Sequence, residues 1–284
     1  MELVALRTFL TVVEEGGILS ASRKLNTVQS NVTNRIKRLE EELGAELFYR
    51  RGRGLELAPS GRVLLDYTHQ ILQLESRAGA AVRQVGEQTG ELRIGSMESF
   101  AALRLPPVLK ALREQHAGMD LFVQTDPSAA LVEQVANHKL DCAFVGGPVN
   151  HPDLVAIPVI TDELVLVRAR HATDGHLPLI LFRDGCAYRE RALTWQRETR
   201  YPSEDVMELG TLDGIIGCVA MGLGCTLMPR WIVSHSRHCD ELTTEALPDH
   251  LAKIPTVLVH HRDCLPMKAI DTLIQEASGQ TIPT

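Results

Sequence analysis

The strongest constraint on the fold of this chain is an apolar stripe within residues 25–54, LNTVQSNVTNRIKRLEEELGAELFYRRGRG. Its apolar residues are Val28, Val32, Ile36, Leu39 and Leu43. They follow one another at steps of four, four, three and four, which is the spacing of a single helix face. Gly44 comes next, and glycine is the usual residue just after a helix C-terminus. The pattern predicts one helix that buries this face and ends at Gly44.

The opposite face of the predicted helix is polar and has almost no acidic residue. It presents Gln29, Ser30, Thr33, Asn34, Arg35 and Lys37. Amide and hydroxyl side chains can contact base edges in the major groove, while Lys and Arg can contact guanine or phosphate. A polar face that is only solvated is the alternative, although such faces more often carry Glu–Lys pairs. We expect the four amide and hydroxyl residues to contact bases and the two cations to contact the DNA backbone.

Two further helices precede this one. Apolar residues at helical spacing predict a helix from Leu3 to Val13 and a second helix over 18–25. A brief turn at Asn26 and Thr27 then leads into the polar-faced helix. Helix, turn and polar-faced helix together form a helix-turn-helix, whose second helix enters the major groove of DNA.

A basic hairpin is expected after Gly44. Short strands at 47–49 and 55–57 enclose a glycine-containing tip with Arg50, Arg51 and Arg53. Such a hairpin next to a helix-turn-helix is typical of a wing. We expect its arginines to contact phosphate or the minor groove.

Charge is distributed unevenly along the 284 residues. The net charge is −7, but residues 1–62 hold ten Lys or Arg against eight Glu, a net +2. A basic N-terminal segment on an acidic body suggests a DNA-binding head. The opening residues do not resemble a signal peptide, and the longest apolar run is shorter than the roughly 20 residues of a membrane span. Six scattered cysteines without CxxC fit a reducing cytoplasm, where we expect the protein to act, away from membranes.

Residues 6–61 contain the motifs QSNVT, I.RLE.ELG..LF.R and LAPSG, in this order. In these motifs the segment resembles the winged helix-turn-helix of LysR-type transcriptional regulators. The resemblance implies a sequence-specific DNA-binding regulator of transcription and not an enzyme. This family commonly has serine before the residue that is Gln29 here, whereas this chain has Val28. We therefore expect no DNA contact from Val28, and a helix cap from Thr27 or Asn26 instead.

A long helix is expected after the wing, because residues 60–88 contain no proline and Ser60 can act as its N-cap. Apolar residues recur there in heptad register, which is typical of a coiled-coil seam. They are Leu64, Tyr67, Ile71, Leu74, Ala78, Ala81 and Val85. Packing on its own domain is the alternative, but the head offers this helix little core. In the LysR family the helix pairs two subunits, which implies a homodimer, a tetramer built as a dimer of dimers, and an operator that is an interrupted dyad.

From residue 90 onward, short apolar runs alternate with helical stretches. The runs predict strands at 92–96, 120–125, 141–147, 164–169, 177–182, 225–229 and 255–261. The stretches predict helices at about 103–117, 128–138, 187–199, 211–222 and 266–278. This alternation favours parallel sheets covered on both faces, and about 195 residues suit two small lobes. We expect the chain to cross between the lobes near 160–163 and 262–266.

The predicted architecture is therefore α/β and has three parts. A winged helix-turn-helix occupies 1–58, a linker helix 59–89, and a two-lobed effector-binding domain 90–284. Lobe 1 is expected at about 90–161 and 266–284, and lobe 2 at about 162–265. The LysR resemblance implies that this domain is similar to type 2 periplasmic binding proteins.

Ligands of open α/β sheets bind at the C-terminal ends of strands, where helix N-termini direct backbone N–H groups at them. Segments of this kind yield ten candidate contacts for a small polar or acidic effector of unknown identity. They are Ser96, Glu98, Ser99, Phe100, Thr125, Ser128, Gly146, Cys186, Tyr188 and Thr211. For each residue alone, helix capping or core packing is an equal alternative. The pattern places no arginine clearly for pairing with a carboxylate.

Thiol-based redox sensing through Cys186 is the alternative function. This cysteine follows Gly185 at a predicted helix N-terminus, with Arg183 and Arg189 nearby. Such an environment lowers the pKa of a thiol and favours the thiolate. No resolving partner for Cys186 is evident in the sequence.

Enzymatic and metal chemistry find little support in the sequence. GxSxG, GxGxxG, Walker and HExxH motifs are absent, so we expect no catalytic residue and no cofactor beyond the effector. The run HSRHC places His235, His238 and Cys239 where one helix face can hold all three. No further ligand pair with zinc spacing accompanies them, so we predict no metal site. The expected partners are double-stranded DNA, a small-molecule effector, RNA polymerase and further copies of the chain.

Overall fold

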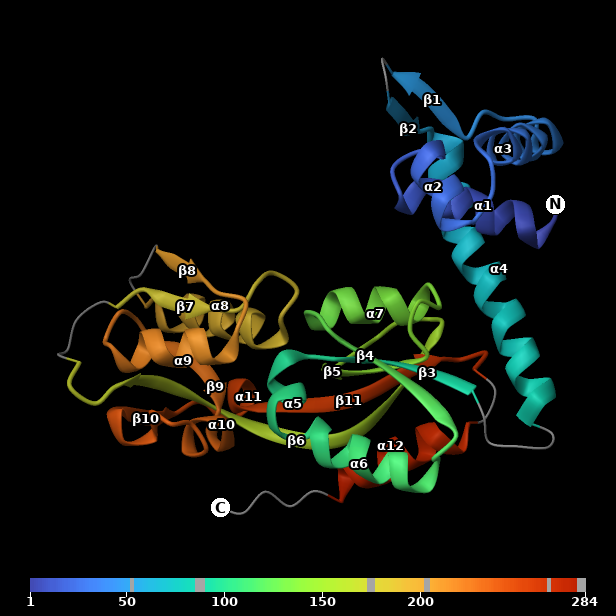
Figure 1. Cartoon of the computed structure of the whole chain (residues 1–284). Helices are drawn as coiled ribbons and strands as arrows, with labels where there is room; N and C mark the ends of the chain where they lie inside the picture. The colour runs from blue at the N-terminus through green and yellow to red at the C-terminus, as the bar shows by residue number, and fades with distance from the viewer. Residues whose placement is uncertain (52–53, 85–89, 173–176, 202–204, 265–266, 280–284) are drawn as a thin grey trace. The chain divides into compact units, whose positions relative to one another are not determined.

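The computed structural model describes residues 1–51, 54–84, 90–172, 177–201, 205–264 and 267–279 (Figure 1). Contacts within the chain divide it into two compact units. The first, termed the head, comprises Met1–Glu87 with Asn137–Lys139. The second, termed the body, comprises Gln88–Ala136 with Leu140–Thr284.

The described part of the head contains helices and one hairpin. Its elements are α1 (Leu3–Glu14), α2 (Ile18–Lys24), α3 (Gln29–Leu43), β1 (Phe48–Arg51), β2 (Gly54–Leu57) and α4 (Pro59–Gln84). β1 and β2 pair antiparallel. Buried residues of α1, α2 and α3 form one core, with Leu6, Phe9, Ala21, Val32, Ile36 and Leu39 among them. The order of elements confirms the predicted winged helix-turn-helix.

The predicted apolar stripe of α3 is buried only at its centre. Val32, Ile36 and Leu39 lie in the core, whereas Val28 is 60% exposed and Leu43 is 42% exposed. Val28 and Leu43, at the two ends of the stripe, lie outside the core that α3 forms with α1 and α2. The predicted stop is confirmed, because the residue after Leu43 is a left-handed glycine.

The predicted helix caps are wrong. The N-cap of α3 is Val28, which makes no side-chain cap hydrogen bond. The Thr27 hydroxyl instead accepts a hydrogen bond from the Asn31 amide at 3.1 Å. α4 begins at Pro59, a residue suited to the first helical position, and the Ser60 hydroxyl donates to the Glu46 carbonyl.

Part of the predicted apolar seam of the linker helix α4 is buried in the head, and part of it is exposed. Leu64 and Ile71 pack in the core of the head, whereas Tyr67 is 58% exposed and Leu74 is 65% exposed. The expectation that this helix finds little core in its own domain is therefore wrong, because α1 lies against it. Tyr67 and Leu74 form an exposed half of the seam. The side chains of the predicted positions Ala81 and Val85 lie outside the described residues.

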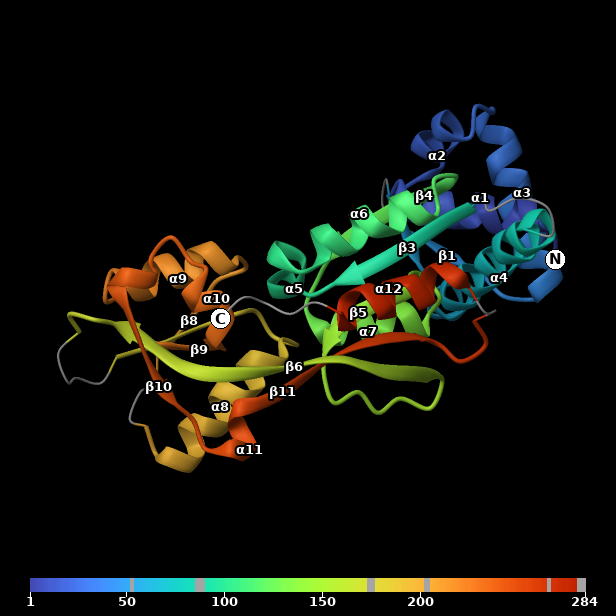
Figure 2. The ribbon, with the colours of Figure 1, turned by 90° about the horizontal axis from the view of Figure 1, so that it is seen from below.

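The body consists of two lobes joined by two long strands. Lobe 1 contains β3 (Gly90–Ser96), α5 (Glu98–Leu103), α6 (Leu105–Gln115), β4 (Met119–Thr125), α7 (Ser128–Ala136), β5 (Cys142–Gly146) and α12 (Lys268–Ser278). Lobe 2 contains β7 (Leu179–Leu181), α8 (Ala187–Thr199), β8 (Val206–Glu208), α9 (Leu212–Ala220), β9 (Thr226–Pro229), α10 (Arg230–Ser234), a 3-10 turn (Cys239–Glu241), β10 (Leu242–Ala246) and α11 (Asp249–Ala252). The joining strands are β6 (Leu154–Ala169) and β11 (Lys253–His261), and Figure 2 shows both running from one lobe into the other.

The described strands of the main sheet follow the order β10-β6-β11-β5-β3-β4, with β9 also paired to β6. β3 is parallel to β4 and β5, and β7 is parallel to β8 in a small separate sheet. Every pairing of β6 and β11 is antiparallel. The prediction of parallel sheets is thus right within lobe 1 and wrong for the joining strands. Alternation along the sequence does not reveal the direction in which a chain returns from a second lobe.

The joining strands also correct the expected crossings. β6 changes partner between Glu163 and Leu164, from β11 to β9 and β10. The first crossing therefore lies at the expected 160–163, but inside one continuous strand. β11 pairs with β5 from Thr256 onward, so the second crossing precedes Thr256 and does not lie at the expected 262–266. Strands β8 and β10 were not predicted, because each is short and mostly exposed.

A buried ion pair lies where the strands cross. Asp162 on β6 accepts hydrogen bonds at 2.8 Å from the Arg104 guanidinium of lobe 1 and from the Trp231 indole N–H of lobe 2. The Thr256 hydroxyl on β11 donates to the second Asp162 oxygen at 3.4 Å. The side chains of Arg104 and Asp162 are only 6% and 3% exposed. One carboxylate thus links both lobes and both joining strands.

Candidate functional site

The exposed face of α3 is the first candidate site. Gln29, Ser30, Asn34 and Lys37 are all exposed. The core of the head holds this helix in place, because the opposite face of the helix is buried there. A rigid helix that presents amide, hydroxyl and ammonium groups has the geometry and chemistry for the major groove.

Two other predicted contacts on α3 are already engaged within the head. The Thr33 hydroxyl donates to the Gln29 carbonyl at 2.9 Å, one helical turn back. The half-buried Arg35 donates from Nη1 to the Thr8 hydroxyl on α1 at 3.4 Å. Arg35 therefore helps to join α3 to α1, a role that helical periodicity alone does not reveal.

The wing is attached to α3 by a carboxylate. Glu40 Oε1 accepts hydrogen bonds from the Leu47 N–H at 2.8 Å and from the Phe48 N–H at 3.4 Å. Gly61 lets α4 approach the residue that precedes β1, because a Cβ on it would lie 2.3 Å from the Leu47 carbonyl oxygen. Of the predicted wing cations, Arg50 and Arg51 are described only as backbone of β1, and Arg53 lies outside the described residues.

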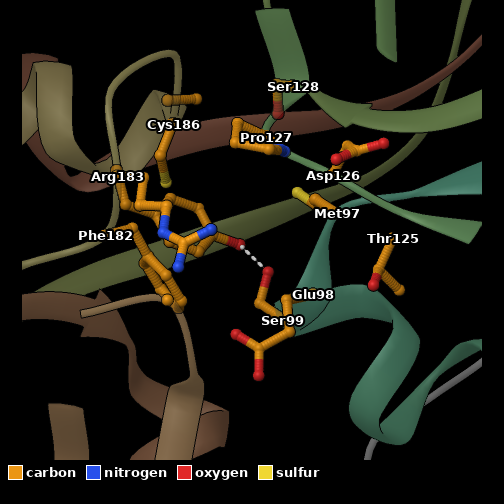
Figure 3. Close-up of a pocket in the computed structure, with 13 residues that line it drawn as sticks. Met97, Glu98, Ser99, Thr125, Asp126, Pro127, Ser128, Phe182, Arg183 and Cys186 are labelled. Carbon is orange, nitrogen blue, oxygen red and sulfur yellow. Dashed lines mark hydrogen bonds between the residues drawn. The ribbon is translucent and has the colours of Figure 1, made fainter. Parts of the chain in front are cut away.

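The second candidate site is a pocket between the lobes of the body, with a volume of about 130 Å³. Lobe 1 lines it with Met97, Glu98, Ser99, Thr125, Asp126, Pro127 and Ser128. Lobe 2 lines it with Phe182, Arg183, Cys186, Ala187, Tyr188 and Gly210. Figure 3 shows Phe182, Arg183 and Cys186 on one side and Met97, Thr125 and Asp126 on the other. A cavity of roughly 150 Å³ can hold benzene, so this pocket suits a small metabolite.

Hydrogen bonds between the lobes surround the pocket. Glu98 Oε1 accepts from the Leu212 N–H at the start of α9, at 2.8 Å. The Ser99 hydroxyl donates to the Tyr188 hydroxyl at 3.1 Å, the bond drawn in Figure 3. The Ala129 N–H at the start of α7 donates to the Gly185 carbonyl at 3.1 Å. One N–H group at the start of each of these two helices is thus already paired with a group of the other lobe.

Burial sets the protonation of three pocket residues. It raises the pKa of Glu98, although the Leu212 N–H lowers this pKa in part. It also raises the pKa of the Tyr188 hydroxyl, and that of the Cys186 thiol. The two neutral groups stay protonated at neutral pH, and Glu98 is an acid that holds its proton more tightly than usual.

The structure brings together six of the ten predicted effector contacts. Glu98, Ser99, Thr125, Ser128, Cys186 and Tyr188 line the pocket. Ser96 and Phe100 are buried in the core, where Phe100 stacks on Phe144 with ring centroids 4.4 Å apart. Gly146 donates its N–H to the Ser128 hydroxyl behind the pocket wall, and Thr211 is exposed at the start of α9. Strand ends therefore located the pocket, but not which side chain at each end faces it.

Several lining residues were missed, of which Arg183 matters most. Its guanidinium packs on Gly210, where a Cβ would lie 3.1 Å from Arg183 Cζ. The sequence pattern placed no arginine clearly for pairing with a carboxylate and considered Arg183 only beside Cys186, whereas Arg183 lines the pocket. Asp126 was also missed, and its Oδ2 already accepts from Gln124 at 3.0 Å and Gln134 at 3.1 Å. Arg183 and Asp126 both follow a strand end and precede a helix, and this position in the sequence is the signal that could have found them.

The proposed thiolate at Cys186 is not supported. Its thiol pKa is raised, not lowered, because burial outweighs the nearby N–H groups and charge. Arg189, expected to favour the thiolate, donates to the Phe182 carbonyl at 2.8 Å and pairs with Glu208 at 3.2 Å. No disulfide bond joins the six cysteines, all of which lie within the described residues.

The cluster His235, His238 and Cys239 does not lie on one helix face as expected. α10 ends before His235, and a separate 3-10 turn begins at Cys239. His238 Nδ1 lies 2.8 Å from Glu241 Oε2. Among the residues that the structure describes, no group of three or more His, Cys, Asp or Glu side chains can hold a metal ion.

Comparison with known families and proteins identifies relatives over the whole length. A family described as "Bacterial regulatory helix-turn-helix protein, lysR family" matches residues 3–62, and one described as "LysR substrate binding domain" matches residues 86–281. The HTH-type transcriptional regulator GltR of Bacillus subtilis (strain 168) is 36% identical over 281 residues, which are 96% of this chain and 95% of GltR. The regulator YofA of the same organism is 36% identical over 279 residues, 97% of this chain and 98% of YofA.

Solved structures share the fold at low sequence identity. A full-length OxyR variant from Pseudomonas aeruginosa has a TM-score of 0.72 at 18% identity, over 98% of this chain and 94% of that one. Full-length CbnR complexed with its target DNA has a TM-score of 0.69 at 18% identity, over 98% of this chain and 99% of that one. Among the described helices, none has the length and apolar character to span a membrane.

Proposed function

We propose a function for this chain from one premise: it belongs to the LysR family of bacterial DNA-binding transcription regulators, which are not enzymes. It binds duplex DNA by placing α3 in the major groove, with Gln29, Ser30 and Asn34 toward the bases and Lys37 toward phosphate. The observation that carries this assignment is the exposure of these four side chains on a helix whose other face is buried. Arg50, Arg51 and Arg53 of the wing supply further phosphate or minor-groove contacts.

Thr33 and Arg35 have a more limited role in this proposal. The Thr33 hydroxyl is bonded to its own helix, so only its methyl group remains for contact with a base. Arg35 is engaged with Thr8, and it acts on DNA mainly by fixing α3 relative to α1. The contacts expected from both residues are therefore weaker than those from their exposed neighbours.

The working unit we propose is a homodimer joined through α4. Tyr67 and Leu74 are exposed on one side of this helix, and large apolar side chains left in water at heptad spacing favour pairing with a second copy. The operator is then an interrupted dyad, because a two-fold dimer presents two recognition helices. The functional parts are the DNA-binding domain at 1–58, the linker at 59–89 and the effector domain at 90–284.

A second surface supports assembly of dimers into a tetramer. β4 forms an edge of the main sheet, and its Phe122 is 54% exposed and its Val123 37% exposed. An apolar edge strand favours pairing with another chain. The assembled regulator acts in the cytoplasm, where its DNA and RNA polymerase are found.

The effector we propose is a small metabolite with an acidic group, bound in the pocket between the lobes. Arg183 supplies the guanidinium that meets the acidic group, and Ser99, Thr125 and Ser128 supply hydroxyl groups. A ligand that contacts both lobes stabilises one arrangement of them. That preference changes the spacing of the paired heads and so the occupancy of the promoter.

Selection from a random duplex library with the full-length protein tests the DNA-binding role. We expect enrichment of an interrupted dyad with half-sites about one helical turn apart, roughly 10.5 base pairs, or a multiple of it. Enrichment of no sequence would contradict the assignment of α3 as a reader of bases. Selection of a single half-site would contradict the dimer.

A thermal-shift screen tests the sensory role. An organic acid at about 100 times its dissociation constant should add roughly 2.7 kcal/mol to the stability of the body. The Arg183→Gln variant should lose most of this response, while Arg113→Gln, an exposed arginine on α6, should keep it.

A further inference from the structure

Glu98 is an unusual member of the pocket, because one of its two carboxylate oxygens is buried without a partner. Oε1 accepts from the Leu212 N–H at 2.8 Å. Oε2 is out of contact with solvent and accepts no hydrogen bond from any residue that the structure describes. The other carboxylate of the pocket, Asp126, is already bonded to two glutamine amides. Asp126 accepts both bonds through Oδ2, so among the described lining residues Glu98 differs in that its unpaired carboxylate oxygen is buried.

The cation of the pocket lies near the same turn. Arg183 packs on Gly210, and Glu98 bonds to the backbone of Leu212, two residues further along. The turn that connects β8 to α9 thus has a guanidinium against one end and a carboxylate against the other. Both charged side chains line the same pocket.

Resting on the proposed function, we infer that the effector is an α-amino acid. Its ammonium group pairs with the Glu98 carboxylate, which turns the covered Oε2 toward the ligand on binding, and its carboxylate accepts from Arg183. These two groups sit on one carbon in an α-amino acid, which matches opposite charges at the two ends of a short turn. The pocket volume of about 130 Å³ suits such a molecule with a small or medium side chain.

Alternative ligand classes leave a charge of the pocket unpaired. A plain carboxylic acid can pair with Arg183, but it leaves Glu98 Oε2 without a donor and brings a second negative charge beside it. A simple amine can pair with Glu98 and leaves Arg183 unused. A buried acceptor without a partner costs free energy, so the ligand that satisfies both groups binds best.

Burial gives Glu98 a property that supports this role. It raises the pKa of the carboxyl group above its ordinary value, and a nearby ammonium group reverses that effect by favouring the charged form. Binding of the amino acid is therefore expected to weaken as the pH falls and Glu98 becomes protonated.

Isothermal titration of the full-length protein with matched ligands tests the inference. The probes are the proteinogenic L-amino acids, each beside its 2-hydroxy acid and its deaminated acid, which keep the side chain and the carboxylate. We expect at least one amino acid to bind about 10-fold to 100-fold more tightly than both of its matched acids, the range for loss of a hydrogen bond between charged groups.

The Glu98→Gln variant tests whether Glu98 causes the preference for amino acids over their matched acids. The amide keeps the shape of the side chain and an oxygen for the Leu212 N–H, but it has no charge to pair with ammonium. We expect the ratio between amino acid and hydroxy acid to fall to about one in this variant. Glu114→Gln is the matched control, because Glu114 is an exposed residue of α6 outside the pocket, and it should keep the wild-type ratio. Melting of each variant verifies that it is folded.

Each other outcome overturns a defined statement. If acids bind as tightly as their amino acids, or if only acids bind, the amino-acid inference is wrong and the proposed effector pocket stands. If the preference for amino acids survives in Glu98→Gln, the role of Glu98 is wrong. If neither class binds and neither stabilises the protein, the inference and the proposed sensory function both fail.

Discussion

The recognition face of α3 and the pocket of the body present polar groups to a partner in opposite ways. On α3 the groups are exposed, and one local core beneath them holds the helix. In the pocket Ser99 and Tyr188 are each 3% exposed, and the bond between them joins positions 89 residues apart. The exposed site depends on one helix and its core. The buried site depends on every contact that holds two lobes together.

Spare hydrogen-bonding capacity also differs between the two regions. On α3 the exposed polar groups can bond to water until DNA arrives, so an unoccupied site costs little. In the pocket Glu98 Oε2 has no solvent contact, so burial disfavours the charged form of this carboxylate. Substitutions on α3 should therefore alter binding alone, whereas substitutions in the body should alter stability as well.

The largest expected effect is on the ion pair that links the lobes. Asp162→Ala leaves the Arg104 guanidinium buried without its carboxylate, and we expect a loss of about 3–5 kcal/mol in the free energy of unfolding of the body. Urea unfolding followed by tryptophan fluorescence measures it, because both tryptophans, Trp195 and Trp231, lie in the body.

A double variant is the control for this prediction. Arg104→Met with Asp162→Leu removes both charges, and it should recover most of the lost stability. If Asp162→Ala unfolds at the urea concentration of the wild type, the crossing does not depend on this carboxylate.

The head is expected to be most sensitive to substitution at Gly61, where the backbone of α4 lies closest to the backbone of Leu47. Gly61→Ala places a Cβ 2.3 Å from the Leu47 carbonyl oxygen, and the required shift should cost about 1–3 kcal/mol. Circular dichroism should then show loss of helix at lower urea than the change in tryptophan fluorescence. Gly17→Ala is the control, because no atom lies within 4 Å of a Cβ at Gly17. Coincident loss of both signals in Gly61→Ala would argue against separate responses of head and body.

Base recognition by α3 should be separable from stability. Asn34→Ala removes an exposed amide, and we expect it to reduce discrimination between the selected operator and random DNA by about 1–3 kcal/mol at unchanged unfolding free energy. Lys37→Ala is the comparison variant. It should weaken binding to both DNAs alike and reduce the salt slope by about one. Equal loss on both DNAs for Asn34→Ala would remove this residue from base readout.

The smallest expected effect is a gain in stability at the pocket. Because burial raises the pKa of Glu98 above its ordinary 4.5, the folded protein holds this proton more tightly than the unfolded chain does. The stability that this bound proton adds to the folded state is fully present below about pH 4.5. It is lost as the pH rises through the raised pKa of Glu98. Glutamine does not ionise, so Glu98→Gln avoids this loss. We expect the ligand-free variant to melt about 2–4 °C above the wild type at pH 7, and the gain is small because Glu98 is only half-buried.

The gap between Glu98→Gln and the wild type should close as the pH is lowered toward 4.5. Scanning calorimetry across this range measures it. A constant gap, or a lower melting temperature for the variant at pH 7, would show that the unpaired oxygen does not destabilise the pocket.

Prediction from sequence succeeded and failed for identifiable reasons. The winged helix-turn-helix follows from helical spacing and a glycine stop, which are interactions between residues three or four positions apart. Arg35 shows the limit even there, because its bond to Thr8 links two helices that periodicity treats separately. In the body, strand ends identified the right segments, but Phe100 points into the core and Arg183 into the pocket, and nothing in either segment distinguishes the two directions.

The sequence by itself determined the order of elements, the recognition helix with its polar face, and the chain segments that meet at the pocket. Tertiary structure alone decided that β6 and β11 both run through the two lobes, that Asp162 joins them, and that Glu98 bonds to Leu212 across 114 positions. The physical reason is range. Local spacing sets which face of an element is apolar, whereas the partner of that face, and the charge left unpaired beside it, depend on how distant parts of the chain pack together.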